Sequence, residues 1–313
     1  MKKFLKLVLW VTLFMVIINL LPDIGFSYGL LNYSKRYKYA NWHHVLYDSI
    51  NADLLILGSS RAWAQYDPHI LDSSLLVQSY NLGVDGGGLE RQLVTYKIYL
   101  CYQNKTPKYL IINFEYWGTW REEHPWGYQR EQYFPLLLKP KARKLIEEKD
   151  GFYFNEFYIP MCRYYLYGFS SLIKDFREED DIIEYKGYAG HEWKWDGKEF
   201  SKIESISFEP PQNLIEEFDC FLENSKLTGV NIVFVCSPIY IELTEKVNNL
   251  SEFYDLLHYY SEKYEIPVLD YIYDTLCYDT AYFYNATHLN KTGAELFTTK
   301  LCHDLDSLGI LQN

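Results

Sequence analysis

A serine and a histidine far apart in the chain are the first candidates for chemistry. Ser60 lies in Gly58-Ser-Ser-Arg61, directly after an apolar run, and His288 lies in the polar stretch Tyr284-Asn-Ala-Thr-His-Leu-Asn. A serine hydroxyl is a weak nucleophile until a base removes its proton, and histidine is the usual base at neutral pH. The base also needs a group that holds its other ring nitrogen, and Asn285, three residues before His288, is the nearest candidate. These residue types together indicate attack on an acyl carbonyl.

Glycines follow a second apolar run, where such a reaction would need N–H donors. Asn81-Leu-Gly83 ends this run, and Asp85-Gly-Gly-Gly88 comes next. Glycine lets backbone N–H groups approach a ligand and donate to an oxyanion. Each motif alone also fits a plain turn, a bent loop or a structural histidine. Their order is more telling: Gly-x-Ser follows the first run, Asn-x-Gly follows the second, and the histidine precedes the last helix.

Regular elements can bring these motifs together. Short apolar runs at 52–60, 75–83, 108–117, 229–238 and 266–271 alternate with helical patterns at 89–102, 213–226, 249–263 and 291–308. This alternation predicts an α/β fold whose parallel sheet is covered by helices on both faces. Ligands of such sheets bind beyond the carboxyl ends of the strands, where the motifs lie. The stretch from about 118 to 210 breaks the rhythm, and we interpret it as an aromatic-rich insertion or lid.

This constellation resembles the SGNH (GDSL-type) hydrolase superfamily over residues 52 to about 305, apart from the insertion. It looks most like the membrane-anchored or exported branch that includes alginate O-acetylation and D-alanyl teichoic-acid proteins. The resemblance implies a three-layer sandwich with a five-stranded sheet in the order 2-1-3-4-5. It also implies that Ser60 is the nucleophile and that the backbones of Ser60 and Gly83 donate to the oxyanion. Asn81 and Arg61, beside these motifs, and Glu115, at the end of the third run, are further candidates for substrate binding.

The sequence departs from the family pattern at the third catalytic position. The family's Asp-x-x-His corresponds to Asn285-Ala-Thr-His288, so an amide stands where a carboxylate is expected. Asn can orient an imidazole but cannot stabilise the imidazolium by charge. Asp279 is a possible substitute, and the family's Gly-x-Asn-Asp block has no counterpart. Weak activity or an inactive relative is therefore an open alternative, as is a purely structural Asn that caps the turn before the last helix.

The N-terminus predicts a membrane segment. Lys2, Lys3 and Lys6 flank a run without charge up to Pro22, which is close to the roughly 20 apolar residues that a span needs. A cleaved signal peptide is the rival interpretation, but no A-x-A-like site follows the run. We expect an uncleaved signal anchor within residues 1–26, with the helix at about 4–22, then a Tyr-rich linker at 27–50 and the body at 51–313. The basic tail places the body outside the cytoplasm, although basic residues near Lys35 weaken this assignment.

Composition limits the partners. The formal net charge is −12, and an acidic surface repels phosphate backbones, so we expect no nucleic-acid partner. The 31 Tyr and 8 Trp serve either ordinary packing or stacking on sugar rings. The six Cys contain no C-x-x-C pair, so zinc is not expected, and both disulfides and buried thiols stay open. We expect no metal and no cofactor.

Two functions follow from these observations. The first is a serine-dependent acyl-ester hydrolase or O-acyltransferase that acts on an exported cell-surface glycan. The second is a weak or inactive scaffold or binding subunit beside a membrane-bound O-acyltransferase. The intact Ser60 and His288 favour the first, and Asn285 favours the second. A carbohydrate-binding module, based on the aromatic insertion alone, is a third and weaker possibility.

Overall fold

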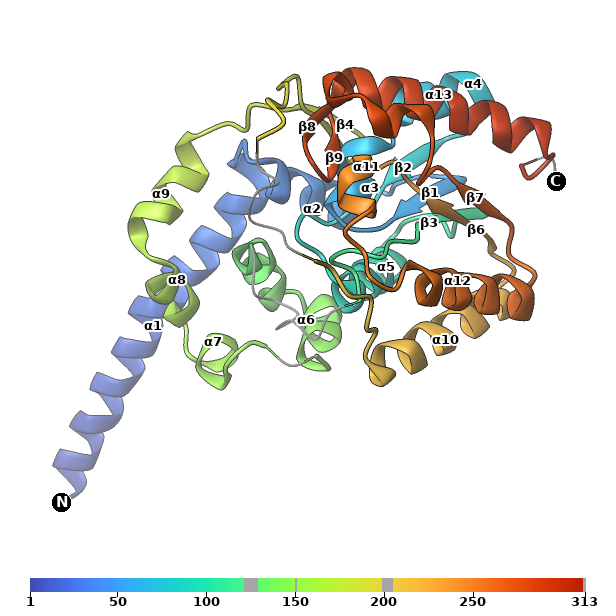
Figure 1. The fold of residues 1–313 in the computed structure, drawn as a ribbon. Coiled ribbons are helices and arrows are strands. Elements are labelled where there is room, and N and C mark those ends of the chain that lie inside the picture. Colours follow the sequence, from blue (N-terminus) through green and yellow to red (C-terminus); the bar gives the residue numbers. More distant parts are fainter. Residues whose placement is uncertain (121–128, 150, 199–204, 312–313) are drawn as a thin grey trace.

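A five-stranded parallel sheet forms the centre of the computed structural model, which describes residues 1–120, 129–149, 151–198 and 205–311 (Figure 1). Its spatial order is β2-β1-β3-β6-β7, and every neighbouring pair is parallel. This arrangement confirms the predicted order 2-1-3-4-5. The strands are β1 (Leu54–Leu57), β2 (Ser79–Asn81), β3 (Tyr109–Asn113), β6 (Asn231–Cys236) and β7 (Val268–Asp270).

Helices cover both faces of the sheet, as predicted. One face carries α5 (Leu89–Cys101), α10 (Gln212–Leu227) and α12 (Leu250–Tyr264), and the other carries α3 (Ser60–Gln65), α4 (Pro68–Leu75) and α13 (Lys291–Ser307) (Figure 1). Strand β1 shows why two layers form, because its four residues are all apolar and buried. Leu55 and Leu57 join one core, while Leu54 and Ile56 join the other. Successive side chains of a strand point to opposite faces, so a wholly apolar strand needs cover on both sides.

Short elements complete the edge of the sheet where the strands end. The short helix α11 (Ile241–Thr244) follows β6. The 3₁₀ turns η3 (Thr275–Tyr278) and η4 (Thr280–Tyr282) follow β7. The antiparallel hairpin of β8 (Phe283–Asn285) and β9 (His288–Leu289) then leads into α13. This hairpin carries the candidate histidine to the carboxyl ends of the central strands.

The predicted insertion contains short helices and one hairpin between β3 and α10. Its elements are η1 (Arg130–Leu138), α6 (Pro140–Glu147), α7 (Phe154–Tyr158), α8 (Cys162–Tyr167), α9 (Phe169–Arg177), β4 (Ile183–Tyr185) and β5 (Tyr188–Gly190). Parts of the expected range, 121–128, 150 and 199–204, lie outside the described residues. The hairpin lies along the edge strand β2, where the N–H of Asn81 donates to the carbonyl of Lys186 over 2.9 Å. Residues after β5 therefore reach the same end of the sheet as Ser60.

The N-terminal helix α1 (Lys2–Tyr33) is longer than the expected segment of about 4–22. Its length and composition would allow it to cross a membrane, a property that a signal sequence shares. Its first half extends away from the body (Figure 1). Its second half packs on the body through Leu30 and Leu31, and α2 (Tyr37–Tyr47) follows after a short break. Residues 27–50, which we expected to be a linker, are thus mostly helical, because their apolar side chains are buried against η1, α5 and α9.

Candidate active site

Two neighbouring serines follow β1, and they face different surroundings. The hydroxyl of Ser59 is buried, donates to the carboxylate of Glu115 over 2.8 Å and accepts the N–H of Arg61 over 3.2 Å. It therefore caps the N-terminus of α3, a position where serine is favoured. Ser60, the first residue of α3, is partly exposed. The turn thus holds one serine inward and leaves the next one facing outward.

Two glycines allow the helix α3 to pack closely against the neighbouring backbone. A Cβ atom on Gly83 would lie 2.3 Å from the backbone nitrogen of Trp63, in the first turns of the helix. A Cβ on Gly58 would lie 2.6 Å from the Cβ of Ala62 and 2.8 Å from that of Asn113. No larger residue fits at either position without a shift of backbone. The glycines of Gly-x-Ser and Asn-x-Gly therefore have a packing role.

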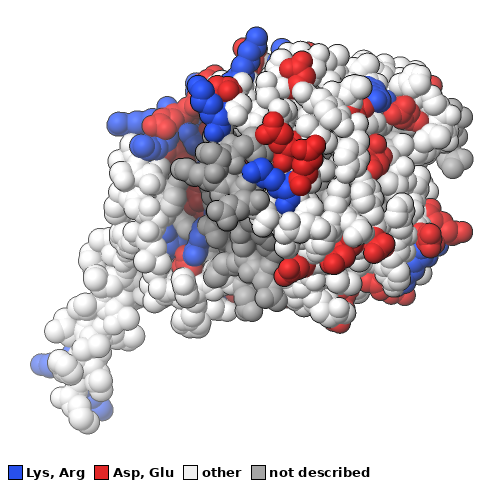
Figure 2. Space-filling model, viewed as in Figure 1, with Lys and Arg blue, Asp and Glu red and all other residues white. Residues whose placement is uncertain are grey.

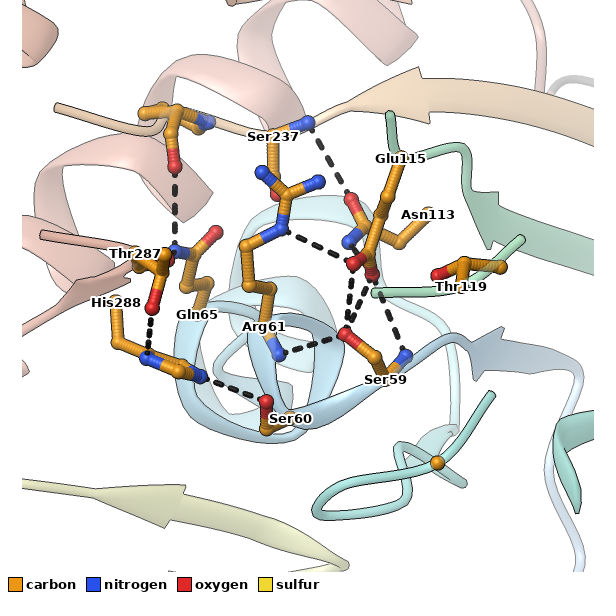
Figure 3. Close-up of polar contacts among 12 residues, drawn as sticks. Ser59, Ser60, Arg61, Gln65, Asn113, Glu115, Thr119, Ser237, Thr287 and His288 are labelled. Carbon is orange, nitrogen blue, oxygen red and sulfur yellow. Dashed lines mark hydrogen bonds and ion pairs between the residues drawn. The ribbon is translucent and has the colours of Figure 1, made fainter. Parts of the chain in front are cut away.

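His288 meets Ser60 from the other end of the chain. The hairpin β8–β9 places the imidazole Nε2 at 2.7 Å from the hydroxyl Oγ of Ser60, and the two side chains point toward each other in Figure 3. This separation is within hydrogen-bond reach of a nucleophile and its base. The two residues are 228 positions apart in sequence.

Asn285 fixes the turn that presents His288. Its side-chain oxygen accepts the backbone N–H groups of Thr287 and His288 over 2.9 and 3.0 Å, which is an Asx turn. Because only the oxygen of the amide can accept two N–H groups, its orientation is settled. The same oxygen lies 2.9 Å from Nδ1 of His288, and the hydroxyl oxygen of Thr287 lies closer, at 2.7 Å. Because this hydroxyl donates its own proton to Asn285 over 3.0 Å, both oxygens are acceptors for Nδ1, and Nδ1 is the donor. Nε2 is then left with a lone pair that faces Ser60. Asn290, and not Asn285, caps the helix α13, so the structural role of Asn285 is confined to this turn.

The electrostatic surroundings keep His288 neutral. Burial of most of the ring, then the positive charge of Arg61 and then His191 lower the pKa of the imidazole from 6.5 to about 3. The carbonyl of a neutral amide offers no charge to oppose these effects. Asp279, the possible substitute carboxylate, accepts the N–H of Ala281 at the start of η4 and makes no contact with His288 among the described residues. The base is therefore in the proton-accepting form but weakly basic.

The expected oxyanion donors are only partly free. The N–H of Gly83 donates to the side-chain oxygen of Asn81 over 2.8 Å, so it is engaged, contrary to our expectation. Asn81 is fully buried, and its amide nitrogen donates to the carbonyls of Ala62 and Tyr66. Asn81 thus ties β2 to α3 and does not reach a substrate. The N–H of Ser60 makes no hydrogen bond within the part of the chain that the structure describes, and it remains a donor candidate.

Glu115 and Arg61, which we expected to bind substrate, form a buried pair behind the nucleophile. Nε of Arg61 lies 3.2 Å from the Glu115 carboxylate, and each side chain is at most 3% exposed. Figure 3 shows Arg61 pointing away from Ser60, toward Glu115 and Ser237. The carboxylate also accepts the amide of Asn113. Both side chains are buried beneath the turn and support it from within the fold, so they do not face a substrate.

The insertion contributes residues that sequence reasoning missed. His191 and Trp193 follow β5, and the His191 ring lies 4.5 Å from that of Tyr284 and 5.3 Å from that of Trp63. Tyr284 in turn stacks on His288, with ring centres 5.2 Å apart. His191 is buried, neither ring nitrogen has a hydrogen-bond partner among the described residues, and burial lowers its pKa. No motif spacing marks these residues, so only their aromatic composition gave a signal.

A cavity of about 210 Å³ lies beside this aromatic group. It is bounded by Trp63, Gly83 and His191, and neither Ser60 nor His288 lines it. Most of the remaining walls are aromatic, amide and charged side chains, and the rest are Val45, Val84, Thr95 and Ile182. The first group consists of Tyr37, Trp42, Trp193, Asn41, Gln129, Gln132, Arg36, Lys38, Asp85, Asp180 and Asp181. Such a mixture of apolar faces and a few polar groups is typical of sites for small ligands.

Metal and disulfide chemistry have no visible place in the described residues. No group of three or more His, Cys, Asp or Glu side chains in them is arranged to hold a metal ion. All six cysteines are free thiols, and Cys236, Cys277 and Cys302 are buried. Burial raises the pKa of Cys277 to about 12 and that of Cys302 to about 11. These buried thiols are therefore unreactive at neutral pH.

Comparison by sequence finds no relative: no family model and no curated protein matches the chain. Comparison by structure finds an assigned acylhydrolase from Bacteroides fragilis NCTC 9343, with 11% identity and a TM-score of 0.39 over 86% of this chain and 94% of the other. A protein assigned to the G-D-S-L lipolytic family from Desulfitobacterium hafniense DCB-2 has 10% identity and a TM-score of 0.40, over 80% and 97%. A GDSL-like lipase from Bacteroides thetaiotaomicron VPI-5482 has 10% identity and a TM-score of 0.38, over 88% and 98%. At these values the comparisons carry no conclusion about function, which rests on the geometry of the site.

Proposed function

We propose that the chain is a serine-dependent acyl-ester hydrolase or O-acyltransferase. The observation that carries the proposal is the relay from Ser60 Oγ to His288 Nε2, over 2.7 Å, and from His288 Nδ1 to the oxygen of Asn285, over 2.9 Å. The relay lies beyond the carboxyl ends of a parallel sheet, where such folds bind ligands. A nucleophile, a base and an orienting group in this geometry are the parts that acyl transfer requires.

The reaction begins with attack of Ser60 Oγ on the carbonyl carbon of an ester. His288 Nε2 takes the hydroxyl proton, while Asn285 holds the Nδ1 proton in place. The backbone N–H of Ser60 donates to the oxygen on which negative charge develops. The proton on Nε2 then passes to the leaving alcohol, and the acyl group stays on Ser60. Water, or a hydroxyl of an acceptor, attacks the acyl-serine by the reverse sequence, and this choice separates hydrolysis from transfer.

An exported glycan is the substrate class that the surroundings favour. Trp63, Trp193 and Tyr37 border the cavity and offer flat apolar faces of the kind that stack on sugar rings. The neighbouring amides and carboxylates can bind hydroxyl groups. His191 adds two ring nitrogens without protein partners in the described structure. The cavity reaches the relay indirectly: the ring of His191, which lines it, packs on Tyr284, and Tyr284 stacks on His288.

A catalytically weak scaffold is the second candidate, and two observations favour it. The N–H of Gly83 is bonded to Asn81, which leaves one fewer donor for an oxyanion. The pKa of His288 is lowered to about 3, so the imidazole is a poor proton acceptor. Such a subunit would bind the glycan beside a membrane-bound O-acyltransferase without turning over esters itself.

Retention of α1 as a membrane anchor is part of the proposal. A signal peptidase that cut after about residue 26 would remove Asp23, which is buried and paired with Arg163 over 2.7 Å. Loss of one partner of a buried ion pair costs roughly 3–5 kcal/mol. The folded body therefore depends on a residue of the apolar helix, which favours an uncleaved anchor with the body outside the cytoplasm.

The test is covalent labelling of the full-length chain in detergent with a fluorophosphonate, followed by mass spectrometry of the adduct. We expect the adduct on Ser60, loss of labelling and of p-nitrophenyl acetate hydrolysis in Ser60→Ala, and unchanged behaviour in Ser73→Ala, an exposed serine on α4. Loss of a serine nucleophile lowers kcat by about 10⁶-fold in known triads. Equal labelling of wild type and Ser60→Ala would leave the scaffold as the better candidate.

A further inference from the structure

The short helices α7 to α9 expose an unusual number of large apolar side chains. Eight of them, each 47–73% exposed, lie within residues 153–173: Tyr153, Phe154, Tyr158, Ile159, Tyr165, Leu166, Phe169 and Ile173. We call this set the apolar face. Phe154 packs on Tyr158 and Tyr165 packs on Phe169, and large exposed apolar surface marks an interaction site in a soluble domain.

Exposed charge is missing from the same segment. Residues 151–173 contain only two charged side chains, Glu156 and Arg163, and each is buried. Glu156 is paired with Arg130, and Arg163 is paired with Asp23 of α1. The chain as a whole carries a formal charge of −12, so this stretch differs sharply from the rest of the surface. Figure 2 shows the protruding helix and the body beside it mostly in white, with few charges.

The apolar face adjoins the helix that we propose as the anchor. The hydroxyl of Tyr165 donates to the side-chain oxygen of Asn19 over 3.0 Å, so α8 lies at the level of the last residues of the apolar run. At 1.5 Å per residue, residues 4–22 span about 28 Å, close to the roughly 30 Å of a bilayer core. The boundary between acyl chains and headgroups thus falls near residues 19–23 of α1, where α8 makes contact.

We propose that the apolar face rests on the lipid bilayer, at the boundary between headgroups and acyl chains. The proposal relies on retention of α1 as an anchor. Three of the eight side chains are tyrosines, Tyr153, Tyr158 and Tyr165, and an aromatic ring with a polar tip favours this boundary. Absence of exposed charge removes the cost of bringing the segment to lipid. The body is then held by two contacts, so it cannot swing freely about α1.

Photolabelling of the full-length chain tests the proposal. The protein is reconstituted in phosphatidylcholine vesicles that contain a lipid with a diazirine on its acyl chain, and adducts are mapped by mass spectrometry. We expect adducts on α1 and on residues 153–173. We expect none above background on Leu227 or Leu308, which are exposed apolar residues elsewhere on the body. Added salt should leave the labelling unchanged, since no charge mediates the contact.

A double variant sharpens the result. Phe154→Glu with Leu166→Glu places charge on two exposed positions, so the fold should be kept, and labelling of residues 153–173 should be lost while that of α1 remains. Leu227→Glu is the matched control and should label as wild type. Adducts confined to α1 in the wild type would overturn the proposal, in favour of a protein partner on this face. Absence of adducts from α1 as well would overturn the anchor itself.

Discussion

The amide of Asn285 fixes the proton of His288 on Nδ1 without adding negative charge. In a triad with a carboxylate, the third group both orients the imidazole and stabilises the imidazolium. Here the first task is met, because backbone N–H groups of Thr287 and His288 hold the amide oxygen toward Nδ1. The second is not met, and Arg61 adds a positive charge nearby. We therefore expect a slow enzyme whose limit is the basicity of His288.

Replacing Asn285 by Asp should speed ester hydrolysis. A carboxylate near an imidazole raises its pKa by about 1–3 units, which brings His288 closer to the assay pH and strengthens it as a base. We expect kcat for p-nitrophenyl acetate to rise by about 10-fold. The rate of general base catalysis increases with the pKa of the base, but by less than the full increase in basicity. Asn285→Ala removes orientation as well and should be slower than wild type. A wild-type rate in Asn285→Asp would show that the amide serves only the turn.

The pH profile should depart from that of an ordinary histidine base. With the pKa lowered to about 3, His288 stays neutral throughout the range from pH 8 to 5, so kcat/KM should remain level where a histidine of pKa 6.5 would already be half protonated at pH 6.5. In Asn285→Asp the acid limb should move to higher pH, since the carboxylate raises the pKa. Steady-state kinetics in overlapping buffers check both profiles. An acid limb near pH 6.5 in the wild type would contradict this assignment.

Sequence reasoning at the residue scale found the groups that meet but not all of their roles. Ser60 and His288 could be proposed because both follow strand-like runs or precede a helix, and such positions converge in a parallel sheet. The engagement of Gly83 by Asn81 depends on a side-chain rotamer that no spacing reveals. His191 reaches the site through the hairpin β4–β5, whose position on the edge of the sheet is a tertiary fact.

At the scale of elements, the site depends on how closely α3 approaches β2 and β3. Its first turn is held by the hydroxyl of Ser59 on Glu115 and by the contact of Gly83 with Trp63. The Arg61–Glu115 pair lies beneath the same turn and is closed off from water. Buried pairs of this kind add little net stability but penalise the loss of either partner. The orientation of Ser60 is therefore a property of three elements packed together.

Substitution of Gly83 by Ala should disturb the packing of α3 against the sheet. The new methyl group would lie 2.3 Å from the backbone nitrogen and 2.6 Å from the Cα of Trp63, so α3 or β2 must move. Overpacking of this kind typically costs 1–3 kcal/mol, and the displaced Ser60 should react more slowly with a fluorophosphonate. Gly88→Ala is the matched control in the same loop, since its Cβ would meet nothing closer than 3.6 Å. Urea unfolding and labelling rates of the full-length variants give the comparison, and equal values for both would refute the role of Gly83.

The strands of the sheet and the covering helices α5, α10, α12 and α13 could be predicted because each has a clear apolar period, whereas the short helices α3 and α4 were not expected. The helix expected at 213–226 is observed at Gln212–Leu227, and that expected at 249–263 at Leu250–Tyr264. The strands are shorter than the apolar runs at both ends. The run at 75–83, for example, begins with the last residue of α4, and β2 covers only Ser79–Asn81. The helices of the insertion could not be predicted in the same way. They are only 5 to 9 residues long, so each offers too few turns for a repeated apolar period to mark it in the sequence.

At the scale of the whole molecule, the apolar N-terminal helix is part of the folded body. Asp23 accepts the N–H of Met161 over 3.0 Å and pairs with Arg163, while Ser27 bonds to Tyr164 over 2.7 Å. No pattern in the sequence indicates these contacts, because the partners are about 140 residues apart. These contacts join the apolar helix, the insertion and the site in one unit, since the insertion also supplies His191.

Retention of the helix should be visible in the size of the mature protein. We expect the membrane fraction to contain the intact chain from Met1, because cleavage near residue 26 would strand the buried charge of Arg163 at a cost of roughly 3–5 kcal/mol. Intact-mass spectrometry of the purified protein measures this directly. A mature chain that begins near residue 27 would contradict the anchor, whatever the activity of the body.

The buried ion pair between Asp23 and Arg163 allows a direct test of how far the body depends on α1 for its stability. Arg163→Met alone should lower the free energy of unfolding of the full-length chain in detergent, since Asp23 would be left buried and unpaired. Asp23→Asn together with Arg163→Met removes both charges, and much of the loss should be recovered, because an apolar replacement of a buried pair is often neutral or stabilising. A surface pair, Lys35 with Glu179, serves as the control, and Lys35→Met should change stability by less than about 1 kcal/mol. If the single and double variants at Asp23 and Arg163 were as stable as wild type, α1 would be only tethered to the body, and cleavage would again be compatible with the fold.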